Sequence, residues 1–207
     1  MIRAYAAIVV PLIIIAALVI SGATTPGYDP VKQTISEFGP GLGGTSSVAF
    51  YGFVLATCVW QPISKRLRPS FSSAMLVASL LAIAVGCVGI NFVGAEPWPW
   101  NSMGWQGRLH LILAFVFVFA AIPVACVSAA AALPASWRGL RAVSLATGAG
   151  CLGLLAGTLM ALSGPHPNPF AATHLGLIER AYVFAFLIWQ CIVSTRVVRS
   201  APDKDRS

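Results

Sequence analysis

The stretch from Leu109 to Leu133 reads LHLILAFVFVFAAIPVACVSAAAAL and contains no Asp, Glu, Lys or Arg. A helix needs about 20 mainly apolar residues to cross the hydrocarbon core of a bilayer, so this stretch predicts a transmembrane helix. The rest of the chain has the same character, because only 9% of its 207 residues are charged, against about 25% in an average soluble domain. A chain of this length cannot bury so much apolar surface inside itself. We therefore expect lipid to surround most of it.

Five further apolar runs are each long enough to span with little or some tilt. The sequence thus predicts an all-α polytopic membrane bundle of six transmembrane helices, in a single domain over residues 1–207. The first run could also be the core of a cleavable signal peptide, since Arg3 precedes it and Ser21-Gly22-Ala23 follows it. Its uncharged stretch is long for that, and we favour an uncleaved anchor. The predicted spans are about 4–20, 47–63, 71–93, 109–133, 142–162 and 177–198.

The basic residues define the orientation of the bundle. A net charge of +7 would suggest a nucleic-acid partner in a soluble protein. Here, however, ten of the thirteen Lys and Arg residues fall on one side of the predicted spans. Because cytoplasmic loops carry an excess of Lys and Arg, both termini are predicted to be cytoplasmic, and we expect no nucleic-acid partner. The ten are Arg3, Lys65, Arg66, Arg68, Arg138, Arg141, Arg196, Arg199, Lys204 and Arg206.

Side chains capable of acid–base chemistry are concentrated at the opposite, outer end. Four of the six carboxylates and all three histidines belong to outer connections or to the adjoining helix ends. Any chemistry is therefore expected at this end. The residues are Asp29, Glu37, Glu96, Glu179, His110, His166 and His174.

The connection after the first span predicts a short helix on the membrane surface. Asp29 is a good N-cap, Pro30 suits the first helical position, and Gly39-Pro40 is a stop. An apolar face formed by residues 31, 35 and 38 would rest on the membrane or the bundle. In one interpretation Asp29 only caps the helix and Glu37 is solvated. In the other, the helix is a lid that presents Ser36 and Glu37 to a pocket.

His110 lies about one helical turn inside the predicted fourth span, where a polar side chain needs a partner. The candidates are Asn91, Glu96 and Glu179. An ionisable group inside the membrane is a functional hypothesis by default. Trp105, before this span, belongs with Trp98 and Trp100 to a predicted interfacial aromatic belt.

Glu179 and Arg180 must both enter the sixth span, because the uncharged run after them is too short to cross alone. A buried charge there needs an opposite partner. We expect Arg180 to pair with Asp29 or Glu37, and Glu179 to pair with Arg108. Such pairs would fasten the outer end of the bundle.

Three histidines at one end could hold zinc: His110, His166 and His174. The chain nevertheless has no HExxH motif or other fixed ligand spacing, so the sequence does not favour a metal site, and it leaves the identity of any cofactor unknown.

The fifth span carries small residues four apart, at Gly153, Gly157 and Ala161. This spacing lets another helix approach closely. The span is predicted to be central in the bundle, or to contact a second copy or a membrane partner.

Several short motifs resemble one family of membrane proteins. They are Tyr28-Asp29-Pro30 with Ile35-Ser36-Glu37-Phe38-Gly39, Gly107-Arg108-Leu109-His110, and Gly176-Leu177-Ile178-Glu179-Arg180 followed by Trp189. Together they resemble the domain-of-unknown-function family 998, a family of six-helix prokaryotic membrane proteins, over nearly the whole chain. The resemblance implies a bacterial or archaeal plasma-membrane protein with motif positions at Asp29, Ser36, His110 and Arg180, and it supplies no activity. Phe92-Val93-Gly94-Ala95-Glu96-Pro97 departs from the family pattern, which leaves the role of Glu96 open.

The sequence supports two function classes about equally. In the first, an enzyme acts on or binds a lipid or isoprenoid at the outer leaflet, with His110 as the acid or base and a carboxylate of Asp29, Glu37 or Glu179 orienting it. The alternative is a non-enzymatic accessory or structural component that uses the same cluster to lock its helices. Transport of a small solute or lipid is less favoured, because residues 111–133 and 143–162 carry no charge. The candidate substrate-binding residues are Ser36, Asn91, Arg108, Arg180, His174 and Trp105.

Overall fold

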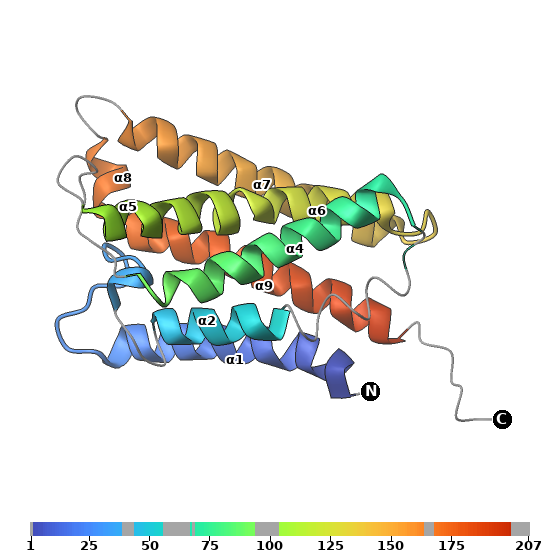
Figure 1. The fold of residues 1–207 in the computed structure, drawn as a ribbon, viewed down its shortest axis with the longest axis horizontal. Helices are drawn as coiled ribbons and strands as arrows, with labels where there is room; N and C mark the ends of the chain where they lie inside the picture. The colour runs from blue at the N-terminus through green and yellow to red at the C-terminus, as the bar shows by residue number, and fades with distance from the viewer. Residues whose placement is uncertain are drawn as a thin grey trace.

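The computed structural model describes residues 2–38, 44–55, 67, 69–93, 104–163 and 168–199. These residues form an elongated bundle of helices, and the described part contains no strand (Figure 1). Ile2 and Arg199, the first and last described residues, lie at the same end of the bundle. The long helices are α1 (Ile2–Thr24), α2 (Thr45–Val54), α4 (Phe71–Ile90), α5 (Trp105–Ile112), α6 (Ala121–Ala132), α7 (Arg138–Leu162) and α9 (Leu175–Arg199), with short elements η1 (Ser36–Phe38) and α8 (Pro169–Thr173).

Five helices of the described chain are long and apolar enough to cross a membrane. They are Tyr5–Thr24, Phe71–Ile90, Trp105–Ala132, Arg138–Leu162 and Leu175–Arg196, and they match five of the six predicted spans. The other predicted span, 47–63, begins as α2, and its part beyond Leu55 lies outside the described residues. The all-helical polytopic bundle predicted from hydropathy is therefore confirmed.

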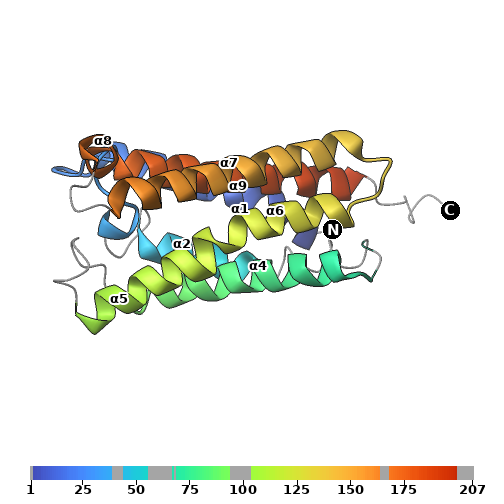
Figure 2. The ribbon, with the colours of Figure 1, turned by 90° about the horizontal axis from the view of Figure 1, so that it is seen from above.

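The helices close into a ring in chain order. α1 packs on α2, α2 on α4, α4 on α6, α6 on α7 and α7 on α9, and α9 completes the ring by packing on α1. Figure 2 shows that α7 and α5 diverge toward the end opposite the termini, and Figure 1 shows the same separation. The core inside the ring is apolar, with Ile83, Ile122 and Phe186 almost completely buried.

The predicted span 109–133 is interrupted by a π-helical segment, η4 (Leu113–Phe119), between α5 and α6. Pro123 has no N–H and therefore cannot donate to the carbonyl of Phe119, one α-helical turn earlier. The hydroxyl of Tyr182 on α9 donates to that carbonyl instead. Long π-helical segments are rare and often occur at functional sites. This one lies beside the cavities described below.

The small residues of α7 do not lie at the centre of the bundle. A side chain added at Gly153 or Gly157 would meet no other atom within 4 Å, and α7 packs only on α6, α8 and α9 among the stronger helix contacts. The prediction of a central helix is wrong, because this glycine face points out of the ring. Contact of Gly153, Gly157 and Ala161 with a second copy or a membrane partner remains a prediction.

The connection after α1 is not the predicted surface helix. A single turn forms at Asp29, where the N–H of Gln33 donates to the Asp29 carbonyl over 2.8 Å, and a 3-10 turn follows at Ser36–Phe38. The helix does not continue, because N–H groups of α9 bind the carbonyls of Val31 and Lys32, which would otherwise accept the next helical hydrogen bonds. The Leu177 N–H donates to the Val31 carbonyl at 3.0 Å, and the Gly176 N–H to the Lys32 carbonyl at 3.3 Å. We call residues Tyr28 to Phe38 the clasp loop.

Candidate functional site

Two cavities meet at one polar site near the end of the bundle that carries the clasp loop. The first, the central cavity, has a volume of about 70 Å³ and lies inside the ring, with walls from α1, α2, α4, η4 and α9. The second, the side cavity, has a volume of about 120 Å³ and lies between α5, η4, α7, α9 and the clasp loop. Both are mainly apolar. The residues that line both cavities are Ser36, His110, Ala114, Phe119 and Glu179.

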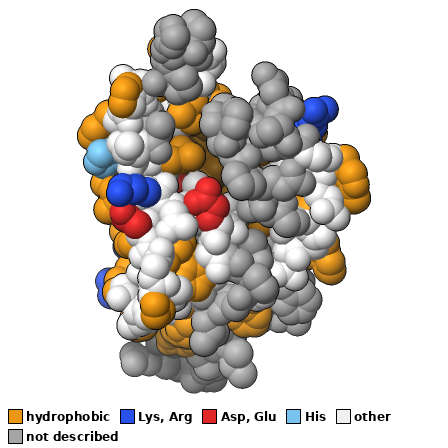
Figure 3. Space-filling view, turned by 90° about the vertical axis from the view of Figure 1, so that its left-hand side faces the viewer, with side chains coloured by type: hydrophobic (Ala, Val, Ile, Leu, Met, Phe, Trp, Pro, Cys, Tyr) orange, Lys and Arg blue, Asp and Glu red, His pale blue; other side chains and the backbone are white. Residues whose placement is uncertain are grey.

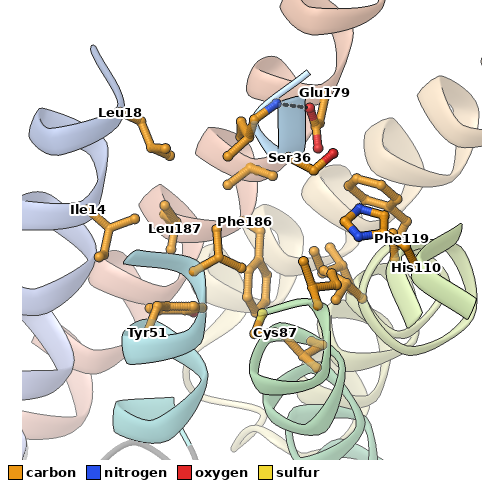
Figure 4. A pocket seen from close by; sticks show the side chains of 18 residues that line it. Ile14, Leu18, Ser36, Tyr51, Cys87, His110, Phe119, Glu179, Phe186 and Leu187 are labelled. Atoms are coloured by element: carbon orange, nitrogen blue, oxygen red, sulfur yellow. Dashed lines mark hydrogen bonds between the residues drawn. The ribbon is translucent and has the colours of Figure 1, made fainter. Parts of the chain in front are cut away.

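Three of these shared residues carry the chemistry: Ser36, His110 and Glu179. We call them the polar site (Figure 4). They come from η1, α5 and the first turns of α9, which are far apart in the sequence. Figure 4 shows Ser36 and Glu179 on one side of the central cavity, with His110 and Phe119 beside them and apolar side chains below. The arrangement suits a ligand with a polar head and an apolar body.

His110 is buried, with 3% of its surface exposed. Its Nδ1 lies 3.1 Å from the carbonyl oxygen of Val93, just after α4. A carbonyl can only accept, so Nδ1 carries the hydrogen, and Nε2 is an acceptor whenever the ring is neutral. The predicted partners were different: Asn91 accepts a hydrogen bond from Ser46, Glu179 binds the clasp loop, and Glu96 lies outside the described residues.

The carboxylates of Glu179 and Glu37 hold the clasp loop through its backbone. Glu179 accepts a hydrogen bond from the N–H of Ile35 at 2.6 Å, which is the dashed line in Figure 4. Glu37 accepts from the N–H of Thr34 at 3.0 Å and lines the side cavity. Hydrogen bonds from an N–H to a carboxylate are stronger than those between neutral groups. These two bonds fix the segment that brings Ser36 to the cavities.

Arg180 is enclosed by the opposite side of the clasp loop, with 8% of its surface exposed. One terminal nitrogen donates to the carbonyls of Pro30 and Gln33, each at 2.8 Å, and to that of Gly176 at 3.0 Å. The other donates to the hydroxyl of Tyr28, whose ring also lies under the guanidinium. Burial raises the pKa of Tyr28 above its ordinary value although Arg180 opposes the shift. This hydroxyl therefore stays protonated and donates to the clasp-loop backbone.

The predicted ion pairs of Arg180 and Glu179 are wrong. Within the described ranges, one ion pair is present, between Lys32 and Asp29 at 3.5 Å. Arg180 binds carbonyl oxygens rather than Asp29 or Glu37, and Glu179 binds an N–H rather than Arg108. Backbone dipoles of one loop thus take the role expected of opposite charges. Because a loop carbonyl has no sequence signature, the residue types alone could not reveal this.

The structure brings together some of the residues predicted for the site and not others. Ser36, Glu37, His110 and Glu179 line the cavities, whereas five candidates do not line either cavity in the described chain. Arg180 lies behind the clasp loop. The five are Asp29, Asn91, Arg108, His174 and Trp105.

Asp29 caps the first turn of the clasp loop, where its carboxylate accepts from the N–H of Val31 at 2.9 Å. This bond lowers the pKa of Asp29. His174 stacks on Phe170 at the junction of α8 and α9. Seen from the end of the bundle that carries the clasp loop, charged side chains occupy a small area among apolar and polar ones (Figure 3).

Sequence reasoning missed the aromatic residues of the site. Phe119 lines both cavities, and Tyr182 lines the side cavity and packs edge-on against Phe119, with ring centroids 5.1 Å apart. Pro123, four residues after Phe119, was the signal that could have indicated an irregular helix there. Among the described residues, no three His, Cys, Asp or Glu side chains are grouped to hold a metal ion. His166 lies outside the described residues.

The apolar helices and the closed ring define a multi-pass helical membrane protein. The chain belongs to the family described as protein of unknown function (DUF998), whose model matches residues 8–196. Neither the curated proteins nor the solved structures contain a match to the chain.

Proposed function

We propose that this protein binds a lipid or isoprenoid molecule at the outer leaflet, with the polar head at the polar site and the apolar chain in the two cavities. The observation that carries the proposal is that both mainly apolar cavities share one polar site, formed by Ser36, His110 and Glu179. An apolar cavity on the order of 150 Å³ stays dry and takes up apolar molecules. Away from the polar site, the apolar walls of the cavities of about 70 and 120 Å³ favour an apolar occupant over water in the same way.

A route from the bilayer supports the same ligand class. The side cavity lies where α5 and α7 diverge (Figure 2). Both helices carry exposed apolar side chains along this stretch, including Ile112 and Leu159. A lipid chain could therefore enter sideways without crossing water, while a polar solute would have to cross an apolar surface.

His110 is the group proposed to exchange a proton with the head. Its Nδ1 is held by the Val93 carbonyl, so the ring orientation is fixed and Nε2 is the acceptor. Glu179 and Glu37, which also line the side cavity, are the carboxylates proposed to orient the head. Asp29 is not among them, because it caps its own turn.

We further propose a prokaryotic plasma membrane with both termini cytoplasmic. Ile2 and Arg199 lie at the end opposite the polar site (Figure 1), and the basic residues Arg138, Arg141 and Arg196 flank helix ends there. The positive-inside rule assigns that end to the cytoplasm. The polar site then faces the outer leaflet.

The second candidate, an accessory component without chemistry, is favoured by one observation. Glu179 and Arg180 both bind the backbone of the clasp loop, which is what a purely structural clamp would do. This candidate explains Arg180 fully, but it gives no reason for His110 to point an acceptor nitrogen toward an apolar cavity.

The experiment compares ligand retention in wild type and a cavity-filling variant. Ala114 lines both cavities, so Ala114→Phe should fill the space beside His110. Ala131→Phe is the matched control, because Ala131 is exposed on α6 and lines neither cavity. Proteins purified in mild detergent are reconstituted in nanodiscs, and lipid retained or bound is identified by mass spectrometry.

We expect wild type and Ala131→Phe to hold the lipid and Ala114→Phe to lose it while keeping its thermal unfolding temperature. His110→Gln, which keeps a polar side chain of similar reach, should weaken binding without changing that temperature. Folded wild-type protein that retains no lipid, or retention equal in all variants, would contradict the proposal and favour the accessory role.

A further inference from the structure

The polar groups that face the two cavities are all suited to accept hydrogen bonds. In the described chain they are the carboxyl groups of Glu37 and Glu179, the imidazole of His110, and the hydroxyls of residues such as Thr34 and Ser36. An ionised carboxyl group only accepts, and hydroxyls can accept as well as donate. No Lys or Arg among the described residues lines either cavity.

Two of the backbone donors next to Ser36 are already used. Loop N–H groups commonly form anion-binding nests, and the clasp loop would be the place for one. Here the N–H of Ile35 donates to Glu179 and the N–H of Thr34 to Glu37. An incoming phosphate would find these two donors taken by carboxyl groups.

The cations at this end are held away from the cavities. The terminal nitrogens of Arg180 donate to three carbonyls and to Tyr28, and its buried Nε has no partner among the described residues and reaches no cavity surface. Lys32 pairs with Asp29 on the exposed side of the loop. Arg108 is exposed on α5 and lines neither cavity. Residues 39–43, 94–103 and 164–167 contain no Lys or Arg in the sequence.

From this distribution of charge we infer that the head of the ligand donates hydrogen bonds and carries no negative charge. A hydroxyl or an ammonium fits the site, and a phosphate or diphosphate does not, because a negative head beside carboxyl groups finds no cation among the described lining residues to balance it. The inference rests on the proposed function and narrows its ligand class. The protein then acts on or holds the dephosphorylated form of such a lipid, an alcohol or amine.

Three probes with one chain and different heads test the inference: farnesol, farnesylamine and farnesyl phosphate. Each is titrated into full-length protein in nanodiscs of zwitterionic lipid, and binding is followed by intrinsic tryptophan fluorescence. We expect the alcohol and the amine to bind, and the phosphate to bind at least about tenfold more weakly. Phosphate binding equal to or tighter than alcohol binding overturns the inference.

A matched pair of variants assigns the effect to charge at the site. Glu37→Gln removes one negative charge from the side cavity, while the amide oxygen can still accept from the Thr34 N–H. Asp29→Asn makes the same change on the same loop outside the cavities. The preference for alcohol over phosphate should narrow severalfold in Glu37→Gln and stay unchanged in Asp29→Asn. An equal effect of both variants, or none, contradicts the assignment.

The two proposals fail in different ways. If no probe binds folded wild type, the proposed function fails and the inference with it. If the phosphate binds best and Ala114→Phe abolishes that binding, the lipid-binding function stands and only the inference about the head group is wrong.

Discussion

Gly176→Ala tests how closely the clasp loop must approach α9. A Cβ at this position would lie 2.7 Å from the carbonyl carbon of Gln33 and 2.8 Å from the carbonyl oxygen of Pro30, and closer still to the Gln33 oxygen. These are backbone atoms, so no side-chain rotation can relieve the overlap. The loop must move away from α9.

The size of the loss follows from that movement. Ordinary contact begins near 3.4 Å, so the Gln33 carbon must retreat by at least about 0.7 Å, and the nearer Gln33 oxygen requires more. The Leu177 to Val31 and Gly176 to Lys32 bonds, now 3.0 and 3.3 Å, would lengthen beyond hydrogen-bonding distance. Two lost bonds at about 1 kcal/mol each, with overpacking at the low end of its range, give about 3 kcal/mol.

The assay is thermal unfolding of the purified protein in one detergent, with Gly153→Ala as the control. A loss of about 3 kcal/mol should lower the Tm of Gly176→Ala by about 6–12 °C. Gly153 lies in another long helix with open space around it, so alanine there should stabilise by about 0.5–1 kcal/mol. If Gly176→Ala leaves the Tm unchanged, or raises it as the control does, the close approach of the loop is wrong.

Three further predictions concern the π-helical segment, the clasp loop and the outer face of α7. Tyr182→Phe leaves the carbonyl of Phe119 without its hydroxyl donor, which should cost about 1–3 kcal/mol of stability. Pro123→Ala in the same background supplies an N–H and should recover part of this loss in a double-mutant cycle of Tm values. Strictly additive losses would argue against the link between the two residues. The hydrogen bond from the Val31 N–H lowers the pKa of Asp29 from 3.8, so the stabilisation of the clasp loop by this carboxylate is complete above pH 3.8 and is lost as the pH falls through the lowered pKa. Asp29→Asn should therefore remove this pH dependence from the hydrogen exchange of the loop. An acid profile that is the same in wild type and Asp29→Asn would refute this prediction. If α7 contacts a second copy, Gly157→Cys should give cross-linked dimers in membranes and Val116→Cys, exposed on η4, should not; equal yields from both would contradict a specific contact.

The spans could be predicted from the sequence because lipid imposes a simple rule on them. The run from Phe71 to Val93 needed only its hydropathy, and α4 covers Phe71–Ile90. The start of α4 also depends only on neighbouring residues, because the side chains of Ser70 and Ser73 each accept a hydrogen bond from the backbone N–H of the other. The π-helical segment was not predicted, because it depends on a missing N–H at Pro123 and on a hydroxyl about sixty residues later in the chain.

The sequence indicated some of the side chains that line the cavities, but not the groups that they bind. His110 and Glu179 were expected to be buried together at the outer end, and both line the cavities. Their partners are the carbonyl of Val93 and the N–H of Ile35, which every residue type can supply. Sequence patterns identify side chains, and here the backbone of one loop decides what those side chains bind.

Two adjacent charges on α9 have opposite consequences for the site. A cation buried at the end of a membrane bundle ordinarily needs an acidic partner. Arg180 binds carbonyl oxygens of the clasp loop instead, and within the described ranges it forms no ion pair with Glu37 or Glu179. Both carboxylates can then hold the loop by its N–H groups and still line the cavities. The clasp loop thus encloses the cation and leaves both carboxyl groups at the cavity walls, which is why we propose a head group that donates hydrogen bonds.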